Sequence, residues 1–334
     1  MAVIAYNGRP HLDECLATLQ QQSRTADEVL AIDNGSTDGS GELIRTRYPG
    51  VRLIQLESNR GYAGGCNVAA QLATSEVIVF LNQDVRLDPD WLRELIRPLE
   101  ADPQLAATQS LIMLYDEPSL VNTSSTTVNF LGIGWVTDYR QPAARISLHP
   151  VAFLSGTAFA IRRATFLELR AFDEFYGSYH EDIDLSWRMH LVGSRILLAP
   201  DSRVYHKYQF DRSGRKNFWL ERNRLITLFK NYRAGTIALI LPALLVTEVG
   251  ICILAVVEGW IGDKLAGYRD LVGLWPQIRR NRREVQMNRR IADRRIGILL
   301  VGGITFVERR QPLVRLGGAV LAGYWWVARR LLIW

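Results

Sequence analysis

The chain has 334 residues, 48% of them hydrophobic, with 40 Lys and Arg against 34 Asp and Glu. This length suits one large domain with an appendage or two domains, and a mean hydropathy of −0.01 excludes a protein made mainly of membrane spans. The three cysteines show no C-x-x-C spacing, which argues against a zinc site or a disulfide framework and favours a reducing compartment. We expect no secretion signal, because the chain opens directly into a short apolar strand.

Apolar runs alternate with helical patterns from the start to about residue 110. Strands are predicted at 2–6, 28–34, 51–56 and 75–84, and helices at 11–22, 39–48 and 62–73. This alternation predicts a parallel sheet with helices on both faces, and ligands of such sheets bind at the carboxyl ends of the strands. Polar residues follow three of these strands and are expected to converge on one crevice: Tyr6, Asn7, Asp33, Asn34, Asn82 and Asp84.

From about residue 105 to 210 the segments are shorter and more strand-like. Strands are predicted at 158–163, 195–200 and 203–208, with a helix at 180–192 between the first two and a long helix at 215–232 after them. We interpret this stretch as the acceptor-facing half of one continuous domain, residues 1–230. The remaining residues, 231–334, are expected to form a basic, apolar helical tail that associates with a membrane.

Charge separates these two parts. Residues 231–334 carry 16 Lys and Arg against 7 Asp and Glu, whereas residues 1–230 carry 24 against 27. Arginines gather in "RRNRREVQMNRR" and alternate with apolar runs further on. A nucleic-acid surface is conceivable, but basic residues alternating with apolar ones are more typical of a surface for anionic lipid. We therefore expect an anionic membrane surface as a partner and no nucleic acid.

The apolar segment 236–258 raises the question of how the tail meets a membrane. Its 23 residues are long enough to cross a hydrocarbon core of about 30 Å, but Glu248 near its middle and Pro242 weaken that interpretation. Interfacial helices or a shallow hairpin are favoured. One true span, or an ordinary soluble helical subdomain, remain the alternatives.

Two motifs at predicted strand ends suggest donor chemistry. In "LAIDNGSTDGS" the turn and Asp38 fit ordinary capping, but Asp33 precedes the turn, where its carboxylate can accept from the imide N–H of a uracil or thymine ring. In "VFLNQDVRLDPDWL" the side chains of Asn82 and Asp84 lie on the same side of an extended chain, and alternate oxygen ligands suit a Mg²⁺ ion that bridges a diphosphate. A capped turn before a helix near Asp90 is the plainer alternative.

A third motif, "HEDIDLSWR", crowds three carboxylates at a predicted helix start. Glu181, Asp182 and Asp184 either complement the helix N-terminus, with Asp184 pairing to Arg188, or supply a general base. By itself the motif does not decide between these two interpretations. The loop "NRGYAGGCN" lacks the G-x-G-x-x-G spacing of a dinucleotide site, so its glycines are expected to permit close backbone approach.

As a set, these motifs resemble the inverting family 2 glycosyltransferases of GT-A fold, and more narrowly their rhamnosyltransferase-like branch. The resemblance covers about residues 2–230 and is carried by "AYNG", "AIDNGSTDGS", "NRGYAGGCN", "FLNQDV", "SGTAFAIRR", "FDEFYGSYHEDIDLSWR" and "VYHKY". It implies an α/β fold with a Rossmann-like mixed sheet and a divalent cation, Mg²⁺ or Mn²⁺. One departure is Asn82, which stands where the family's D-x-D pattern has its first Asp.

The resemblance also implies roles for individual residues. Asp182 is the expected base, with Glu181 beside it to orient the acceptor, and Asp84 and His206 are the expected metal ligands. Gly156 and Thr157 are expected on the acceptor side, and Arg188 either contacts the donor or pairs with Asp184. The full set expected to bind the donor is Tyr6, Asn7, Asp33, Asn59, Gly61, Asn82, Asp84 and Arg188.

The expected function is therefore transfer of a sugar, first of all L-rhamnose from dTDP-L-rhamnose, to a hydroxyl of a lipid-linked or cell-surface glycan. The expected location is the cytoplasmic face of the bacterial plasma membrane. A sugar nucleotidyltransferase is the second enzyme class, but "YNGRPHLDE" lacks its glycine- and lysine-rich phosphate loop. A non-catalytic glycan-binding or scaffold protein is the remaining alternative.

Overall fold

The computed structural model describes residues 1–207, 214–304 and 312–334. Two compact units are formed. The first comprises Met1–Thr126, Val136–Leu185 and Ser194–Gln209, and the second comprises Thr127–Trp135, Ser186–Gly193 and Phe210–Trp334. This division concerns packing, so the functional boundary that we expect at residue 230 stays a prediction.

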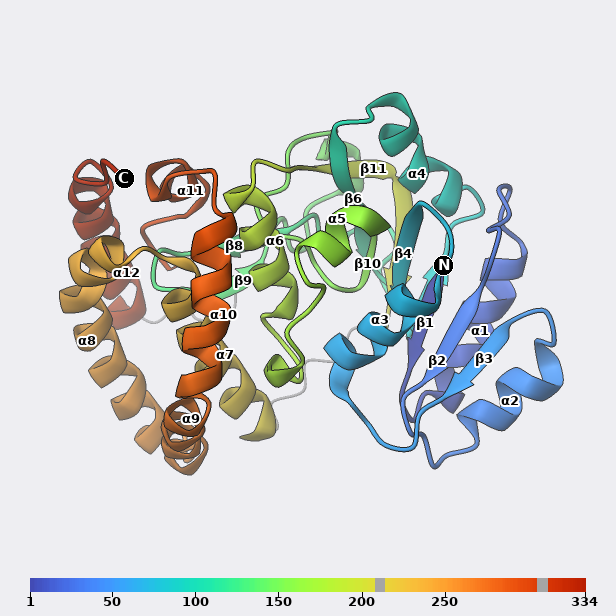
Figure 1. Ribbon diagram of the computed structural model, residues 1–334, viewed down its shortest axis with the longest axis horizontal. Coiled ribbons are helices and arrows are strands. Elements are labelled where there is room, and N and C mark those ends of the chain that lie inside the picture. Colours follow the sequence, from blue (N-terminus) through green and yellow to red (C-terminus); the bar gives the residue numbers. More distant parts are fainter. Residues whose placement is uncertain (208–213, 305–311) are drawn as a thin grey trace. The chain divides into compact units, whose positions relative to one another are not determined.

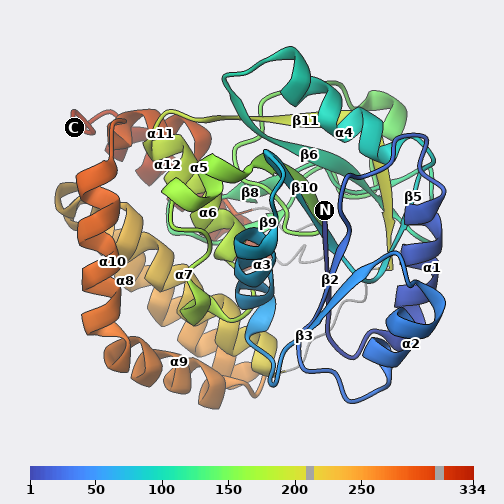
Figure 2. The same cartoon turned by 45° about the vertical axis from the view of Figure 1, so that its right-hand side comes forward.

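A nine-stranded mixed sheet forms the centre of the first unit (Figure 1, Figure 2). Eight strands follow the order β3-β2-β1-β4-β10-β6-β11-β5, and β7 pairs with β6. The bounds are β1 Ala2–Ala5, β2 Leu30–Asp33, β3 Arg52–Gln55, β4 Val77–Asn82, β5 Val85–Leu87, β6 Leu105–Leu114, β7 Val121–Thr123, β10 Ala158–Arg162 and β11 Arg195–His206. Two short strands, β8 Thr126–Val128 and β9 Gly134–Val136, pair separately.

Helices cover both faces of this sheet because successive side chains of a strand point to opposite faces. Val79 and Leu81 of β4 belong to the core cluster with the buried residues of α1 (Arg9–Gln20), α2 (Ser40–Arg47) and α4 (Trp91–Ala101). Phe80, between them, packs against Phe166 and Phe172 on the other face, where α5 (Arg163–Glu168) lies. The sequence pattern of β4 thus fixes which helices share a layer.

The predicted parallel sheet is confirmed for the first four strands. β1 pairs in parallel with β2 and with β4, and β2 with β3, so their carboxyl ends lie at one edge. Beyond β4 the sheet is mixed, because β10 runs antiparallel to both β4 and β6. This is the mixed sheet that a GT-A fold implies.

The second half of the sheet differs from the expectation at β11 and at three strands that were not predicted, β5, β6 and β7. The segments 195–200 and 203–208 were expected as separate strands, but β11 is continuous over Arg195–His206, with a register shift between Ala199 and Arg203. Pro200 lies in this shift, where its missing N–H removes no ladder bond. Residue 208 lies outside the described residues. The central strand β6, Leu105–Leu114, was not expected at all.

Helices make up most of the second unit. They are the end of α6 (Glu181–Leu191), then α7 (Gly214–Asn231), α8 (Ala234–Val257), α9 (Ile261–Gly273), α10 (Trp275–Asn288), α11 (Asp293–Leu299) and α12 (Pro312–Ala328). Phe130 stacks on Trp325 with ring centroids 4.8 Å apart, and Trp187 meets Tyr232 edge-on at 4.9 Å. The tail therefore shares an aromatic core with residues 127–135 and 186–193.

Candidate functional site

The carboxyl ends of β1, β2 and β4 bring several predicted residues together. Asp33 pairs with Ala5, and Asn82 with Ile4, so these two side chains flank the end of β1. Two strand spacings separate them, about 10 Å. Gln83 ties the same ends further, because its Oε1 accepts from the Tyr6 amide at 2.9 Å and its Nε2 donates to the Tyr6 carbonyl at 3.0 Å.

The Asp33 carboxylate accepts more hydrogen bonds within the protein than the sequence suggested. Its Oδ1 accepts a hydrogen bond from the Ser36 amide at 3.0 Å, its Oδ2 accepts one from Gln55 at 3.2 Å, and the residue is only 2% exposed. The turn therefore does explain part of Asp33, contrary to our expectation. Each carboxylate oxygen can accept a second bond, so contact with a donor base stays a prediction.

The loop before α3 (Gly61–Leu72) is organised around Asn59 and Asn34. The side-chain Nδ2 of Asn34 donates to Asn59 Oδ1 at 3.1 Å and to the Gly61 carbonyl at 2.9 Å. Asn59 Oδ1 also accepts from the backbone amide of Gly61. Gly61 has φ +72°, and a Cβ there would lie 2.4 Å from the Gly177 carbonyl oxygen. The predicted close backbone approach is confirmed at this glycine.

Gly156 and Thr157 connect the end of β4, which bears Asn82, with the predicted base Asp182. The Asn82 amide donates to the Thr157 carbonyl at 2.9 Å, and the Gly156 amide donates to Asp182 Oδ2 at 2.9 Å. Asp84 is two residues from Asn82. Residues near 33, 84 and 182, distant in sequence, are thus linked through three neighbouring backbone segments of the first unit.

Tyr62 belongs to this arrangement, although it was not among the residues predicted from the sequence. Its hydroxyl donates to the Gly156 carbonyl, and its ring leaves so little room that a Cβ on Gly156 would lie 3.3 Å from it. Tyr62 and Asp182 therefore hold Gly156 from two sides. An aromatic residue within the small-residue run "GYAGGCN" was the available signal.

The three crowded carboxylates at the start of α6 have different surroundings. Asp184 is fully buried and accepts from the Tyr176 hydroxyl at 3.2 Å. Glu181 is 6% exposed, and burial together with the charges of Asp182 and Asp184 raises its pKa well above the ordinary value. Asp182 stays half-buried and accepts from the amides of Gly156 and Ile183.

These surroundings distinguish the two carboxylates that remain near the crevice. Burial raises the pKa of Asp182, but its two amide donors oppose the rise because they stabilise the ionised form. Glu181 Oε2, in contrast, has no hydrogen-bond partner within the described structure. Because Asp182 accepts from two backbone amides and Glu181 Oε2 accepts from none, Asp182 is the better candidate for a general base, and this role stays a prediction.

The chain enters α6 through strained backbone. Tyr179 and His180 have φ of 68° and 69°, which is uncommon for residues with a side chain. Contacts to α3 over-determine the preceding segment: Arg60 pairs with Glu174 at 2.7 Å, and Asn67 exchanges two hydrogen bonds with the backbone of Phe172. Such strain is typical of sites where a side chain must be aimed.

Asp84 lies beside His206, with 3.3 Å between Oδ2 and Nε2. Burial raises the pKa of Asp84, but the hydrogen bond and the charge of His206 outweigh burial and hold the pKa below its ordinary value. Nδ1 of His206 lies 3.3 Å from Asn122 Oδ1, which leaves Nε2 as the nitrogen that points toward Asp84. The predicted pair of metal ligands is therefore adjacent.

An ionised carboxylate and an imidazole nitrogen fit Mn²⁺ or Mg²⁺ only if other oxygens complete the coordination. Among the described residues no group of three or more His, Cys, Asp or Glu side chains is placed to hold a metal ion. The two adjacent donors thus suit a cation that also binds the oxygens of a diphosphate. Asn82 is half-buried at the end of β4 and adds an amide oxygen without charge.

Arg188 lies later in α6, among the residues that pack with the second unit, and is 6% exposed. Its predicted contact with the donor and its alternative pairing with Asp184 both stay predictions.

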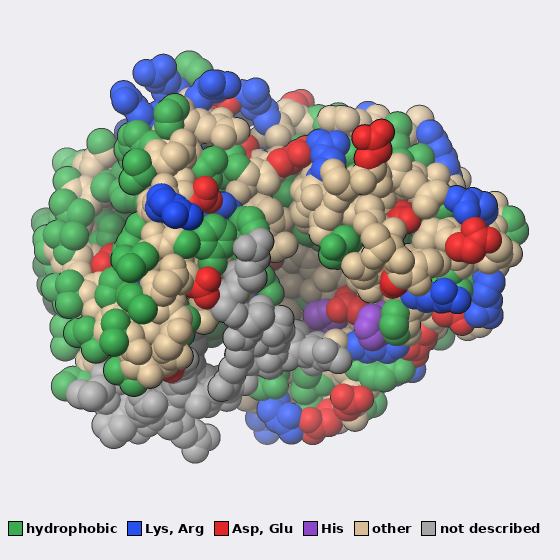
Figure 3. All heavy atoms as spheres, turned by 90° about the horizontal axis from the view of Figure 1, so that it is seen from below, with side chains coloured by type: hydrophobic (Ala, Val, Ile, Leu, Met, Phe, Trp, Pro, Cys, Tyr) green, Lys and Arg blue, Asp and Glu red, His purple; other side chains and the backbone are tan. Residues whose placement is uncertain are grey.

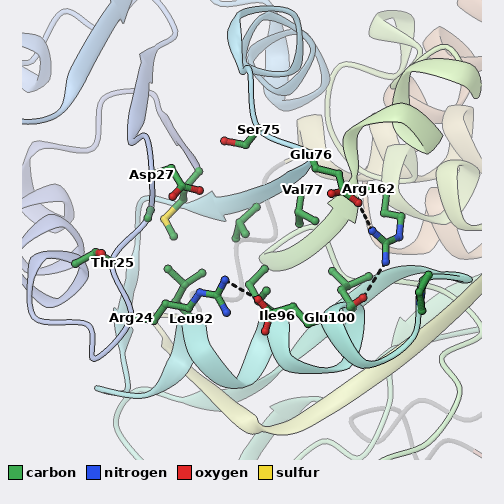
Figure 4. Close-up of a pocket in the computed structure, with 15 residues that line it drawn as sticks. Arg24, Thr25, Asp27, Ser75, Glu76, Val77, Leu92, Ile96, Glu100 and Arg162 are labelled. Atoms are coloured by element: carbon green, nitrogen blue, oxygen red, sulfur yellow. Dashed lines mark hydrogen bonds and ion pairs between the residues drawn. The ribbon is translucent and has the colours of Figure 1, made fainter.

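A cavity of about 490 Å³ lies at the opposite ends of β1 and β4 and involves no candidate residue (Figure 4). Its two arginines are already paired, Arg24 with Glu100 at 2.7 Å and Arg162 with Glu76 at 2.5 Å.

Known proteins share both the sequence and the fold. Residues 1–170 match the family model of glycosyl transferase family 2. The chain is 32% identical over 231 residues to the N-acetylglucosaminyl-diphospho-decaprenol L-rhamnosyltransferase of Mycobacterium tuberculosis, covering 62% of this chain and 75% of the relative. The family model covers the strand ends at Asp33 and Asn82 and also Gly156, and it ends before Asp182 and His206.

Two solved structures share the fold at low identity. TarS 1–349 of S. aureus, in complex with UDP, has a TM-score of 0.56 at 16% identity and covers 98% of this chain and 89% of its own. GalNAc-T7 with UDP, GalNAc and Mn²⁺ has a TM-score of 0.56 at 17% identity, covering 69% and 47%. The mixed sheet, the family match and the rhamnosyltransferase relative agree: this chain has the GT-A fold and belongs to glycosyl transferase family 2, in its rhamnosyltransferase-like branch.

Proposed function

We propose that this glycosyltransferase moves L-rhamnose from dTDP-L-rhamnose to a hydroxyl of a lipid-linked or cell-surface glycan, with inversion at the anomeric carbon. The observation that carries the proposal is the hydrogen bond from the Gly156 amide to Asp182, beside Thr157, whose carbonyl accepts from the Asn82 amide at the end of β4. The M. tuberculosis relative supports the sugar and the acceptor class, since its name specifies an L-rhamnosyltransferase and a decaprenol diphosphate.

The reaction is a single displacement. The acceptor hydroxyl oxygen forms a bond to the anomeric carbon, the bond between that carbon and the nucleoside diphosphate breaks, and the diphosphate leaves with the electron pair. Asp182 takes the hydroxyl proton as the new bond forms. Glu181, whose pKa is raised by burial and by the charges of Asp182 and Asp184, is proposed to orient the acceptor through a hydrogen bond.

Asp84 and His206 would hold a divalent cation, which neutralises charge that develops on the diphosphate. The other contacts to the donor are proposed to come from side chains and backbone of the protein. The loop of Asn59 and Gly61 and the strand ends at Tyr6 and Asn7 border the site where we place the donor. Asp33 is proposed to accept from the imide N–H of the thymine ring through a remaining lone pair.

We place the enzyme at the cytoplasmic face of the bacterial plasma membrane, where a lipid-linked acceptor and a nucleotide sugar meet. The basic charge of the tail, 16 Lys and Arg against 7 Asp and Glu, supports an anionic membrane as the partner.

Turnover of a donor panel with a polyprenyl diphosphate-linked glycan acceptor tests this proposal. We expect dTDP release with dTDP-L-rhamnose, an inverted product by NMR, and loss of turnover in Asp182→Asn with dTDP binding retained. Asp116→Asn, an exposed carboxylate in a loop, is the matched control. Activity with another donor alone would refute the sugar assignment. Full activity in Asp182→Asn would remove Asp182 as the base, and no turnover with any donor would favour a scaffold.

A further inference from the structure

The outer face of α8 is apolar along its whole length. Among the described residues, α8 is the one helix long and apolar enough to cross a membrane by length and composition. Its exposed positions carry no charged or hydrogen-bonding side chain, and the large ones are Leu241, Leu245, Val246, Val249, Ile253, Val256 and Val257. At 3.6 residues per turn, these seven residues occupy an arc of about 160°. An exposed apolar patch of this extent marks an interaction surface.

The inner face of α8 carries a charge that the second unit neutralises. Glu248 pairs with Arg224 of α7 through Oε1 and with Lys264 of α9 through Oε2 at 2.8 Å. Glu221 completes the cluster, at 2.7 Å from Arg224 and 2.5 Å from Lys264. The side chains of Arg224 and Lys264 are each 1% exposed, so this four-residue charge cluster is sealed between three helices.

The charge cluster determines how deeply α8 can enter a membrane. A full span would carry α9 with it, because Lys264 and Tyr268 both bond to Glu248. α9 bears Asp263, Arg269 and Asp270 besides Lys264 within its 13 residues, and Arg269 is exposed. Charged side chains facing lipid at the middle of the bilayer are strongly unfavourable. The cluster thus leaves only the outer arc of α8 available to lipid.

Exposed arginines gather at the N-terminal end of α8. The C-terminal residue Trp334 donates to Thr236 at 2.8 Å and accepts from the Arg294 amide at 3.2 Å, so α11 and the end of the chain meet the first turn of α8. The arginines of these segments are exposed: Arg233, Arg294, Arg295, Arg329 and Arg330. Asp293 beside them is fully buried and pairs with Arg289 at 2.7 Å.

The C-terminal segment exposes both cationic and apolar side chains. Trp326, Leu331 and Ile333 are exposed on either side of Arg329 and Arg330 in the sequence, and the Arg330 guanidinium lies over the Trp326 ring. Figure 3 shows hydrophobic side chains covering the left part of the molecule, where α8 lies. Tryptophan and arginine beside an apolar face are typical of the boundary between headgroups and acyl chains.

We propose that the second unit docks on an anionic bilayer as a monotopic membrane element: the outer arc of α8 lies among the acyl chains, the five arginines bind lipid phosphates, and α8 does not span. The direction of docking rests on the proposed function, which places the enzyme on the cytoplasmic side. The docking itself requires no sugar transfer, so its test is independent of catalysis.

Cysteine labelling of the full chain in cells distinguishes docking from spanning. In a Cys252→Ala background, Ala234→Cys and Glu258→Cys place one thiol at each end of α8, while Cys15 and Cys66 are buried. An impermeant maleimide should label neither variant in intact spheroplasts and both after lysis. Labelling of Glu258→Cys alone in intact spheroplasts would show that α8 spans and would overturn the proposal.

Vesicle sedimentation of the purified full chain tests the docking surface. We expect binding to vesicles of phosphatidylcholine with phosphatidylglycerol, and about fivefold weaker partitioning for each arginine of the group replaced by Gln. Val246→Glu with Ile253→Glu should abolish binding, whereas Leu148→Glu, an equally exposed apolar residue of the first unit, should leave it unchanged. Circular dichroism and the Tm of each variant without ligand check that it is folded.

Two results would refute the docking surface. One is unchanged vesicle binding in Val246→Glu with Ile253→Glu. The other is a wild-type oligomer in analytical ultracentrifugation that this double variant converts to monomers without any loss of vesicle binding, since the arc would then contact a second copy of the chain. A catalytically dead protein that still binds vesicles would leave the docking intact while the proposed function fails.

Discussion

The backbone amide of Gly156 donates a hydrogen bond to Oδ2 of Asp182 at 2.9 Å, while the Gly156 carbonyl accepts one from Tyr62. One glycine therefore connects a tyrosine of α3 with a carboxylate at the start of α6. The amide stabilises the ionised form of Asp182, which is the form that accepts a proton.

The first prediction concerns Tyr62→Phe. Loss of the hydroxyl frees Gly156 to move, weakens its bond to Asp182, and so raises the pKa of Asp182 further. Because Asp182 acts when ionised, the acid limb of kcat/KM against pH should shift to higher pH, with dTDP affinity unchanged. Glu181 also faces Asp182, and burial together with the charges of Asp182 and Asp184 raises the pKa of Glu181. Tyr139→Phe is the control, and an unmoved limb in Tyr62→Phe would contradict the prediction.

The second prediction separates the two neighbouring acids. Glu181→Gln imitates a protonated carboxyl, so turnover should stay within about tenfold of wild type and the acid limb should not move. Asp182→Asn removes the base and should lower kcat by about 10² to 10⁴-fold. The measurement is the pH profile of nucleotide release. If Glu181→Gln moved the limb to lower pH, Glu181 would be the charged member of the pair.

The third prediction concerns the metal pair. Asp84→Asn removes the charged ligand beside His206, so the Mn²⁺ concentration for half-maximal turnover should rise at least about tenfold. A second readout needs no turnover: Mn²⁺ should strengthen the thermal shift by dTDP in wild type but not in Asp84→Asn. Asp90→Asn, at an exposed ion pair before α4, is the control. Metal-independent stabilisation in both proteins would remove Asp84 and His206 as ligands.

The fourth prediction concerns the charge cluster around Glu248. Glu248→Ala leaves Arg224 and Lys264 buried with only Glu221 as a counter-charge, and breaking a buried pair in this way costs about 3–5 kcal/mol. Calorimetry should show a markedly lower Tm for the second unit. Glu258→Ala, an exposed acid at the end of α8, should change stability by less than about 0.5 kcal/mol.

The same cluster predicts a pH dependence. Burial raises the pKa of Glu248, but Arg224 and Lys264 outweigh burial and lower it to about 2. A depressed pKa stabilises the fold above the ordinary value of 4.5, and that stability is lost as the pH falls toward 2. The Tm of wild type should therefore fall more steeply than that of Glu248→Gln between these pH values. Parallel curves would show that Glu248 is not ionised in the cluster.

The order of strands and helices in the first 84 residues could be predicted from the local sequence pattern alone. Short apolar runs, which predict strands, alternate there with segments whose apolar residues recur every 3.6 positions, which predict helices. Each prediction depends only on residues that are neighbours in the sequence. The helix at 180–192 was predicted for the same reason. Pattern failed at β6, Leu105–Leu114, because a strand buried on both faces shows no alternation to distinguish it from a loop or a buried helix.

The sequence by itself determined the chemical inventory: carboxylates at 33, 84 and 182, a histidine at 206, and an apolar helix with one acid in it. Only the tertiary structure decided how the surroundings of Glu181 and Asp182 differ, since these depend on the amides that Gly156 and Ile183 donate to Asp182 and on the burial of Glu181. It also decided that Glu248 faces Arg224 and Lys264. Ionisation and pairing depend on neighbours tens of residues away, and a one-dimensional pattern does not contain those distances.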